Sequence, residues 1–557
     1  MPKITFNKHT LLKNIGKKLS DDQLADRMAM LGTDVESISK DAIEVEVFPN
    51  RPDLLSEQGF ARALKTFLGV RKGLQEYKVN PSTYKVIVDK NVMMRPYTVC
   101  AVVKNIQFTD ERIKDIMQIQ EKLALTHGRG RKKSAYGLYP LDSIHFPLRY
   151  IAKDPKTVQF KPLGFNKMLR ANQIEALHPK GKVYQHITAG WTHYPFFIDA
   201  NDNVLCMLPY TNSEDTGKIT TNTKNVFVEC TGTDLQNLHQ ALNILVTMLA
   251  DMGGTIYTVT MQYPGKTFTT PQLNPATMKL NISLVNKLLG LSLNKSTLKK
   301  LLEKMGYTYV NKKVFIPAYR TDIIHEVDLI EDVAIAYGYE HFPAIIPNIS
   351  TEGREHPMTT FKSKLAELLI GLGLLETSTY HLSSKELQTT KINSTQQPLE
   401  LMDSKSEDYT VLRSSIIPNL LDVLSKNTHH SYPQHLFEMG TIFSGTGTTK
   451  ETGVEEAEHL AITLCGEGAD YTKIKQMVEY LTKHLNIEAT FTAPQRSFDA
   501  FIKGRVAALT IHGTMMGVLG EIHPSVLQNF RLSLPVAAFE INLDMLHTLV
   551  ACGDGNR

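Results

Sequence analysis

The stretch YRTDIIHEVDLIEDVAIAYGYEHFP, from Tyr319 to Pro343, carries the most pointed chemical pattern in the sequence. Asp328, Glu331 and Asp332 stand at positions i, i+3 and i+4, which share one face of a helix. Asp322 lies just upstream, from where the chain can fold back. Like charges at these spacings destabilise a helix by about 0.2 to 0.5 kcal/mol per pair, although the helix dipole favours anions in the first turn. A positive partner is therefore expected.

Three interpretations of this acidic face remain open. It can be a solvated first turn above an apolar face of Leu329, Ile330, Val333 and Tyr337, because acids commonly begin helices. It can be a hard-cation site, since carboxylates without Cys or His at ligand spacing suit Mg²⁺. It can also pair with lysines and arginines of a partner chain.

Length and composition indicate an ordinary multidomain globular protein. A chain of 557 residues exceeds what one hydrophobic core serves, which predicts three to five domains. The 42% hydrophobic and 21% charged composition is typical of folded proteins. The net charge of +4 is small for this length, so any contact with nucleic acid must be local.

The cysteines and the N-terminus predict a cytoplasmic protein. The five cysteines are widely spread and form no C-x-x-C pair, which argues against a disulfide framework and a structural zinc site. They are Cys100, Cys206, Cys230, Cys465 and Cys552. The N-terminus lacks a continuous apolar region, and no apolar stretch is long enough to span a bilayer.

Four domains are predicted from the pattern along the chain. Residues 1–80 combine a strand at 44–48, a turn and a helix to Gly69, which indicates a small α+β module. Residues 81–265 mix strand-like runs such as KVIVD and VFVECTG with long helical runs, which indicates a larger mixed domain.

The second half of the chain contains the other two predicted domains. Residues 266–345 read as a helical module, in which Leu298, Leu301, Leu302 and Met305 form an apolar stripe before a capping Gly306. Residues 355–550 alternate helices with strand-like runs such as HLFEMGTIF and VAAFEI, which favours antiparallel sheet with helices.

Two polar stretches and one basic loop stand out in residues 81–265. NSEDTGKITTN contains Asn212, Ser213, Glu214 and Thr216, and ECTGTD contains Glu229, Thr231, Thr233 and Asp234. Such residues also dominate turns and caps for local reasons. The loop GRGRKKS carries Arg129, Arg131, Lys132 and Lys133 between glycines, which suits phosphate binding, although surface charges are commonly just solvated.

The stretch from Tyr319 to Tyr339 resembles one shared by the β subunits of phenylalanyl-tRNA synthetase in their archaeal and eukaryotic short form. The resemblance extends over nearly the whole chain. It includes FPNRPDLLSEQGFARALKTFLG, GRGRKKSAYGLYPLDSI, NSEDTGKIT, VFVECTGTDL, SEDYTVLRSSIIPNLLDVLSKN, YPQHLFEMGTIF and GVLGEIHPSVLQNF. It implies an N-terminal module, an editing domain, a magnesium-binding module and an inactive class II synthetase-like domain.

The resemblance implies specific sites. In the family the acids matching Asp322, Asp328, Glu331 and Asp332 bind magnesium at the junction with the α subunit. The middle domain hydrolyses tyrosine mistakenly attached to tRNA(Phe), which here implies a pocket at Asn212, Ser213, Glu214, Thr231, Thr233 and Asp234. No Ser/His/Asp or Cys/His arrangement is evident there, so water oriented by Asp234 and Glu214 is favoured over covalent catalysis. Arg129, Arg131, Lys132 and Lys133 are then candidates for contact with tRNA.

The resemblance also implies that the α and β subunits carry different activities. ATP and the adenylation site belong to the α subunit of an α2β2 heterotetramer, and this chain has no convincing ATP-binding arginine motif. GEGAD at Gly466 has no arginine, and the G-K-T at Gly265 lacks the first glycine of a phosphate loop. The expected function is support of ATP-dependent charging of tRNA(Phe), together with hydrolysis of mischarged tRNA. The alternative is a scaffold that binds tRNA through a degenerate editing pocket.

Overall fold

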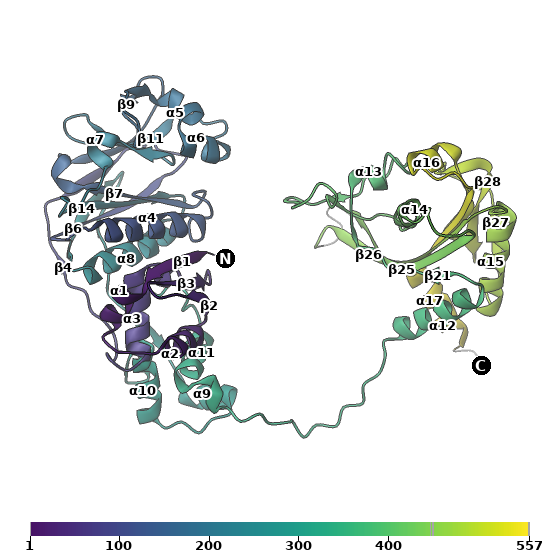
Figure 1. Cartoon of the computed structure of the whole chain (residues 1–557), viewed down its shortest axis with the longest axis horizontal. Coiled ribbons are helices and arrows are strands. Elements are labelled where there is room, and N and C mark those ends of the chain that lie inside the picture. Colours follow the sequence, from purple (N-terminus) through teal and green to yellow (C-terminus); the bar gives the residue numbers. More distant parts are fainter. Residues whose placement is uncertain (1, 446, 448–450, 555–557) are drawn as a thin grey trace. The chain divides into compact units, whose positions relative to one another are not determined.

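The computed structural model describes residues 2–445, 447 and 451–554 and divides into two compact units, 1–346 and 347–557 (Figure 1). Both units contain helices and sheets, so the predicted mixed α+β multidomain class is confirmed. Within the described residues, no helix has both the length and the apolar content needed to cross a bilayer.

The first unit begins with a small module of three helices on a three-stranded sheet. The sheet has the order β1-β3-β2, formed by Lys3–Asn7, Ala42–Val47 and Thr33–Ile38. The helices are α1 (Lys8–Ile15), α2 (Asp21–Met30) and α3 (Glu57–Phe67). Ser56 caps α3, because its side chain accepts a hydrogen bond from the backbone N–H of Gly59.

Two sheets form the middle of the first unit. A five-stranded sheet has the order β4-β15-β6-β14-β7, formed by Val79–Asn80, Thr255–Tyr257, Tyr97–Lys104, Val226–Gly232 and Ser134–Pro140. Helices α4 (Asp110–Leu125) and α8 (Leu235–Asp251) lie along it (Figure 1). Apolar side chains of α4 and α8 share one core with this sheet.

A seven-stranded sheet packs beside the five-stranded one, and its order is β13-β12-β11-β8-β5-β16-β17. These strands are Thr211–Asn212, Val204–Met207, Tyr194–Ile198, Leu148–Lys153, Lys85–Val88, Val259–Tyr263 and Lys266–Thr270. The short elements β9 (Gln159–Phe160), β10 (Leu169–Arg170), α5 (Ala171–Leu177), α6 (Pro179–Tyr184) and α7 (Glu214–Gly217) complete the region.

The predicted boundary at residue 265 is wrong by at least one strand. Tyr263 pairs with Lys266 in an antiparallel hairpin, so the boundary falls inside the turn between β16 and β17. The sheet continues through Thr270 because β17 is hydrogen-bonded along its length to β16.

The acidic module contains a sheet as well as helices, which the prediction of a helical module missed. Helices α9 (Ile282–Leu289), α10 (Lys295–Lys304) and α11 (Glu326–Tyr337) accompany an antiparallel sheet of the order β18-β20-β19. The strands are Ala276–Lys279, Lys313–Ile316 and Thr308–Val310. They are three or four residues long, too short for a clear alternating pattern. The predicted stripe Leu298, Leu301, Leu302 and Met305 is buried.

The second unit is built on a seven-stranded sheet of the order β21-β25-β26-β30-β29-β28-β27. Its strands are Leu375–Glu376, Gln434–Gly445, Val454–Cys465, Val536–Asn542, Thr514–Ile522, Phe501–Ile511 and Ala489–Thr492. All neighbours are antiparallel except β21 and β25. A small sheet, β22-β24-β23, is formed by Leu382–Ser383, Val411–Leu412 and Leu399–Glu400.

Helices flank this second sheet on both faces. One apolar core contains side chains of α12 (Pro357–Gly371), α15 (Tyr471–His484) and α17 (Leu543–Asp554). The core on the other face contains α14 (Ile417–Lys426) and α16 (Pro524–Asn529), with α13 (Lys385–Gln388) beside it.

The first unit is joined internally by one continuous core and by buried charge pairs. The core runs from Ile4 of the N-terminal module through α4 and α8 to Ala336 of α11. Within it, Arg62 Nη1 of α3 lies 2.6 Å from Asp251 Oδ2 at the end of α8, and its guanidinium lies 3.8 Å from the ring centre of Tyr319. The side chains of Arg62 and Asp251 are 5% and 14% exposed. Three of the predicted domains therefore meet at one arginine.

Replacement of Arg62 by alanine is expected to lower the free energy of unfolding of the first unit by about 3 to 5 kcal/mol, because Asp251 is left buried without its cation. Trp191 is the single tryptophan of the chain and lies in this unit. Its fluorescence during urea unfolding of the full chain therefore measures the effect. Arg27→Ala, which removes a surface pair with Glu340, is the matched control. Equal shifts for the two variants would contradict the expectation.

Candidate functional site

Helix α11 carries the acidic face, and Asp328 caps it. Asp328 Oδ2 accepts hydrogen bonds from the backbone N–H groups of Ile324 and His325, at 2.8 and 2.7 Å. His325 Nδ1 in turn accepts from the N–H of Val327 at 3.2 Å. These bonds satisfy backbone donors that a helix start leaves without partners. Asp328 and His325 thus both form hydrogen bonds at the N-terminus of their own helix.

Asp322 and Asp332 share a cation from within the chain. Arg320 donates through Nε and Nη2 to both oxygens of Asp322, at 2.8 and 2.7 Å, and through Nη2 to Asp332 Oδ2 at 2.8 Å. The Tyr307 hydroxyl also donates to Asp332 Oδ2. The Arg320 side chain is 3% exposed. Burial raises the pKa of Asp322, but the charge and hydrogen bonds of Arg320 outweigh it and hold that pKa below its usual value.

The four acids do not fit a single magnesium coordination shell in this structure. Among the described residues, no three of Asp322, Asp328, Glu331 and Asp332 bring carboxylate oxygens within 4.8 Å of one another. The reason is Arg320, which occupies the two inner carboxylates, while Glu331 points outward and is exposed. The expected positive partner of this face is therefore an arginine two residues before Asp322, whose role the sequence pattern had not singled out.

Glu229 on β14 is the centre of a buried polar site. The Tyr139 hydroxyl lies 3.2 Å from Glu229 Oε1 and 3.2 Å from Asn212 Oδ1, and Glu229 Oε2 has no partner among the described groups. Burial raises the pKa of Glu229 to about 8, against the opposing effects of Tyr139, Arg95 and Arg131. Glu229 is consequently a neutral acid at pH 7, able both to donate and to accept a hydrogen bond.

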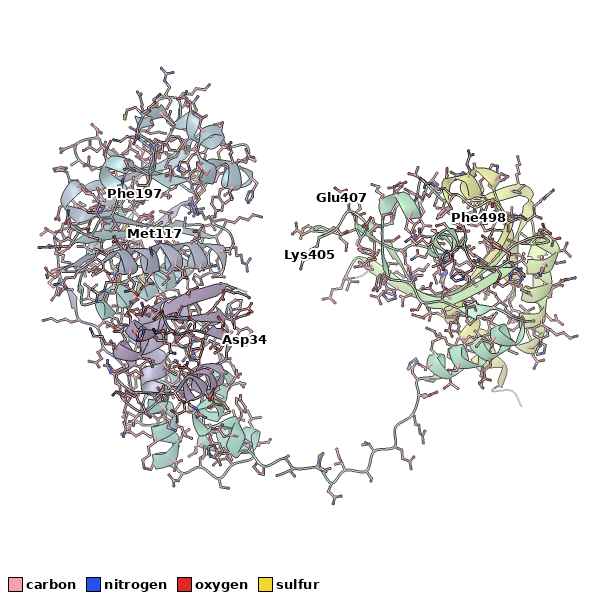
Figure 2. All side chains as sticks on the ribbon, viewed as in Figure 1. Asp34, Met117, Phe197, Lys405, Glu407 and Phe498 are labelled. Carbon is pink, nitrogen blue, oxygen red and sulfur yellow. The ribbon has the colours of Figure 1, made fainter. Side chains whose placement is uncertain are left out.

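A glycine makes room for this acid. Gly137 on β7 pairs with Glu229 across the sheet. A Cβ atom at residue 137 would lie 2.6 Å from Glu229 Oε1 and 2.5 Å from the Tyr139 hydroxyl, closer than atoms of real side chains approach. Phe227, two residues before Glu229, packs against Tyr139 and against Phe197, which Figure 2 labels, with ring centres 5.9 and 6.1 Å apart. The polar site thus has an aromatic wall.

Further buried polar atoms without partners gather around the same strand. Thr231 follows Glu229 on the same face of β14, and its hydroxyl is buried without a hydrogen bond. Arg95 donates to the backbone carbonyls of Thr231 and Arg131, each at 2.8 Å. The Nε atoms of Arg95 and Arg131 are also buried without partners. Buried polar groups are normally satisfied, so this concentration indicates a site for water or ligand.

The structure brings only some of the expected editing residues together. Asn212 reaches Glu229 through Tyr139, and the neighbouring Ser213 is buried at the start of α7. Asp234 instead caps α8 and pairs with Lys133 Nζ at 3.0 Å. Glu214 accepts from the backbone N–H of Gly164 at 2.9 Å and from Lys218 Nζ at 2.6 Å.

Asp234 and Glu214 begin different helices, α8 and α7, and each binds its own local partners. Their joint orientation of a water molecule stays a prediction. Thr233 is exposed. Glu229, which the sequence offers among the polar groups of ECTGTD but not among the six expected pocket residues, is the acid at the centre of the buried site. The available signal was a single acid inside the apolar strand run VFVEC.

The basic loop presents two of its four charges to solvent. Arg131 turns inward and donates to the carbonyls of Pro209 and Tyr210, at 2.7 and 3.1 Å, and lies over the Tyr184 ring. Lys133 pairs with Asp234. Arg129 and Lys132 are exposed. Backbone carbonyls and a carboxylate thus already bind Arg131 and Lys133, and contact of the four charges with phosphate stays a prediction.

Three family models match the chain. They describe a Phe-tRNA synthetase beta subunit B1 domain at residues 1–70, a tRNA synthetase B5 domain at 278–339, and a phenylalanyl tRNA synthetase beta chain CLM domain at 342–543. Phenylalanine–tRNA ligase β subunits of Archaeoglobus fulgidus and Pyrococcus furiosus are 39% and 38% identical. Each alignment covers 98% of this chain, with 98% and 100% of the relatives.

A solved structure supports the same assignment for the first unit. It is an N-terminal fragment of the phenylalanyl-tRNA synthetase β subunit from Pyrococcus horikoshii, 38% identical, with a TM-score of 0.59. It matches 61% of this chain and 100% of the fragment. With identity above one third along nearly the entire length, the chain belongs to the family of phenylalanine–tRNA ligase β subunits.

Proposed function

We propose that this chain acts as the β subunit of a cytoplasmic phenylalanine–tRNA ligase, supporting ATP-dependent charging of tRNA(Phe) by an α subunit in an α2β2 heterotetramer. Family membership over the full chain supports this role. We further propose that the chain hydrolyses tyrosine from mischarged tRNA(Phe). A pocket for phenylalanine rejects an analogue with an added hydroxyl only weakly, so a second site is needed for accuracy.

The buried, neutral carboxyl of Glu229 carries the editing proposal. A tyrosine residue differs from phenylalanine by one phenol hydroxyl, which can both donate and accept a hydrogen bond. Among the described residues Glu229 Oε2 has no hydrogen-bond partner, and the Tyr139 hydroxyl, which also lies near Asn212 Oδ1, contacts the other oxygen. A site whose polar groups are left unpaired by phenylalanine discriminates strongly in favour of tyrosine.

Asp234 is the proposed group for orienting the hydrolytic water. The N–H of Asn237 and the ammonium of Lys133 lower its pKa, so it is an anion at neutral pH and can accept a hydrogen bond from water. Its side chain is 41% exposed, which leaves it accessible to solvent. Glu214 is instead proposed to hold the loop at Gly164, since both of its oxygens are bound.

Magnesium is proposed at the outer half of the acidic face. Among the described residues, Asp328 and Glu331 form no ion pair, in contrast to Asp322 and Asp332. Magnesium often keeps several waters and takes only one or two carboxylates. In this proposal Asp328 and Glu331 bind the ion at a subunit junction, and Arg320 stays paired with Asp322 and Asp332.

The second unit is proposed to act as a scaffold without adenylation chemistry. It contains a cavity of about 590 Å³ whose lining includes Ser415, His459 and Glu540. Ser415 Oγ, the backbone N–H groups of Ile416 and Ile417, and His459 Nδ1 all contact the Glu540 carboxylate, at 2.6 to 3.3 Å. The contacts of the Glu540 carboxylate thus hold the start of α14 in place.

Glu229→Ala is expected to lower the rate of tyrosine release from Tyr-tRNA(Phe) by about 100-fold or more, because the phenol hydroxyl loses its partner. Glu229→Gln keeps a donor and an acceptor and should retain part of the activity. The measurement is deacylation of Tyr-tRNA(Phe), with charging by the α-containing complex followed in parallel.

Glu121→Gln, at an exposed glutamate of α4, is the matched control and should leave deacylation unchanged. Charging with phenylalanine should be the same for all variants. Undiminished deacylation by Glu229→Ala would contradict the proposed role of Glu229 in recognising the tyrosine hydroxyl. Background deacylation by the unaltered chain would favour a scaffold with a degenerate pocket.

Arg129→Ala and Lys132→Ala are each expected to weaken tRNA binding and to reduce the slope of log K against log salt by about 1 or less, as the loss of one phosphate contact does. Filter binding of tRNA(Phe) across a salt series measures the slope. Lys40→Ala, at an exposed lysine of the N-terminal module, serves as the control. A slope unchanged from that of the control would show that the loop is only solvated.

A further inference from the structure

A hollow of about 360 Å³ lies where β11 meets helix α5, at the opposite end of the first unit from α10 (Figure 1). Tyr194 of β11 shares an apolar core with Ile174 of α5, whereas Phe197 packs toward the five-stranded sheet. The hollow is therefore on the face of the seven-stranded sheet that points away from Glu229. Its lining combines an aromatic wall with polar side chains, and includes Lys156, Glu175, Trp191, His193 and Tyr194.

Glu175 presents a hydrogen-bond acceptor to the hollow. Its Oε1 accepts from the Thr188 and Tyr210 hydroxyls, at 3.1 and 2.9 Å, and its Oε2 accepts from the Tyr194 hydroxyl at 3.2 Å. A carboxylate can accept about four hydrogen bonds, so Oε2 has capacity for one more. Among the described residues, Glu175 contacts these hydroxyls and forms no ion pair. The carboxylate thus suits a ligand that brings N–H donors.

Trp191 forms the aromatic wall. Its ring packs edge-on against Tyr194, with ring centres 5.8 Å apart and an angle of 62° between the ring planes. The backbone N–H of Trp191 donates to the Thr188 carbonyl at 2.9 Å, which holds the loop before β11 in place. The indole is partly exposed, so it offers a flat aromatic surface within the hollow. Nucleic acid bases stack on such surfaces.

The mouth of the hollow carries basic groups. Lys156 and His193 both line the hollow and are exposed. The turn that carries Lys156 is ordered by Asp154, whose Oδ1 accepts from the Lys156 backbone N–H at 2.9 Å. Within the part of the chain that the structure describes, the Lys156 ammonium has no ion-pair partner. The flat wall, the acceptor and the cation therefore match three parts of a nucleotide, which are the base, its exocyclic amino group and the phosphate.

Tyr210 connects the hollow with the polar site on the other face of the sheet. Its hydroxyl contacts Glu175, and its carbonyl accepts from Arg131 Nη1 of the basic loop at 3.1 Å. Asn212, two residues later on the edge strand β13, belongs to the polar site around Glu229. The hollow, the basic loop and the proposed editing pocket therefore lie around one edge of the sheet.

We propose that the hollow binds a nucleobase with an exocyclic amino group, cytosine or adenine, from single-stranded RNA. The base stacks on Trp191, its amino group donates to Glu175 Oε2, and Lys156 contacts the adjoining phosphate. Uracil is disfavoured because it presents a carbonyl oxygen to the carboxylate where cytosine presents an amino group. The 3′ end of tRNA is a single-stranded CCA, in which every base carries such a group, so the identity of the RNA rests on the proposed editing function.

The test is quenching of Trp191 fluorescence in the full chain by CMP, AMP and UMP, since Trp191 is the single tryptophan. CMP and AMP are expected to quench to saturation, and UMP is expected to bind about tenfold more weakly, because a repulsion replaces one base contact. Uncharged tRNA(Phe) should also quench, and tRNA(Phe) without its terminal CCA should not. The two forms of tRNA separate binding of an RNA end from binding of a free nucleotide.

Glu175→Gln is expected to bind CMP and UMP with affinities within about twofold of each other, because an amide both accepts and donates hydrogen bonds. Glu121→Gln, at an exposed glutamate of α4, is the matched control and should keep the preference for CMP. Lys156→Ala alters an exposed side chain and tests the site even if Glu175→Gln fails to fold. It should remove the advantage of CMP over cytidine and leave the affinity for cytidine unchanged.

Saturable binding of CMP with a preference over UMP supports the base site even if the chain hydrolyses no Tyr-tRNA(Phe), so failure of the editing proposal is recognised separately. The base site is overturned if CMP and AMP do not quench, or if the unaltered chain binds CMP and UMP with equal affinity. A preference for CMP that survives in Glu175→Gln overturns the role of Glu175. Equal quenching by tRNA(Phe) with and without its CCA overturns the assignment to the 3′ end.

Discussion

The first unit depends on a buried arginine, Arg62, that joins three parts of the chain. Its guanidinium contacts Asp251 of α8, the Tyr77 hydroxyl and the face of Tyr319. Tyr319 immediately precedes Arg320, which holds Asp322 and Asp332. Burying a cation together with its anionic partner costs little free energy, whereas burying it alone costs much more. These contacts therefore favour one arrangement of the module surfaces. The strands around Glu229 and the acidic helix are thereby fixed in one body.

The first unit contains two kinds of carboxylate, whose pKa values differ because their surroundings differ. Acids beside arginine or at a helix start, such as Asp322 and Asp234, have lowered pKa values and remain charged. Acids buried away from a firm cation, such as Glu229 and Glu57, have pKa values near 8 and are neutral at pH 7. The first kind suits structural pairing and the orientation of water. The second suits recognition of a hydroxyl.

Residue patterns predicted the α+β class, the family and the apolar stripe of α10, because these depend on local periodicity and long specific motifs. Partners distant in sequence could not be predicted. Arg131 reads as a surface charge but binds the carbonyls of Pro209 and Tyr210. The importance of Glu229 depends on Gly137 and Tyr139 from another strand, which no local pattern shows.

The central claim is that editing resides in this chain whereas adenylation requires an α subunit. The most direct measurement is phenylalanine-dependent exchange of pyrophosphate into ATP, together with Tyr-tRNA(Phe) hydrolysis, by the purified chain with and without α. The proposed division predicts hydrolysis by the chain alone, and exchange only after α is added. Exchange by the isolated chain, or hydrolysis that appears only with α, would contradict it.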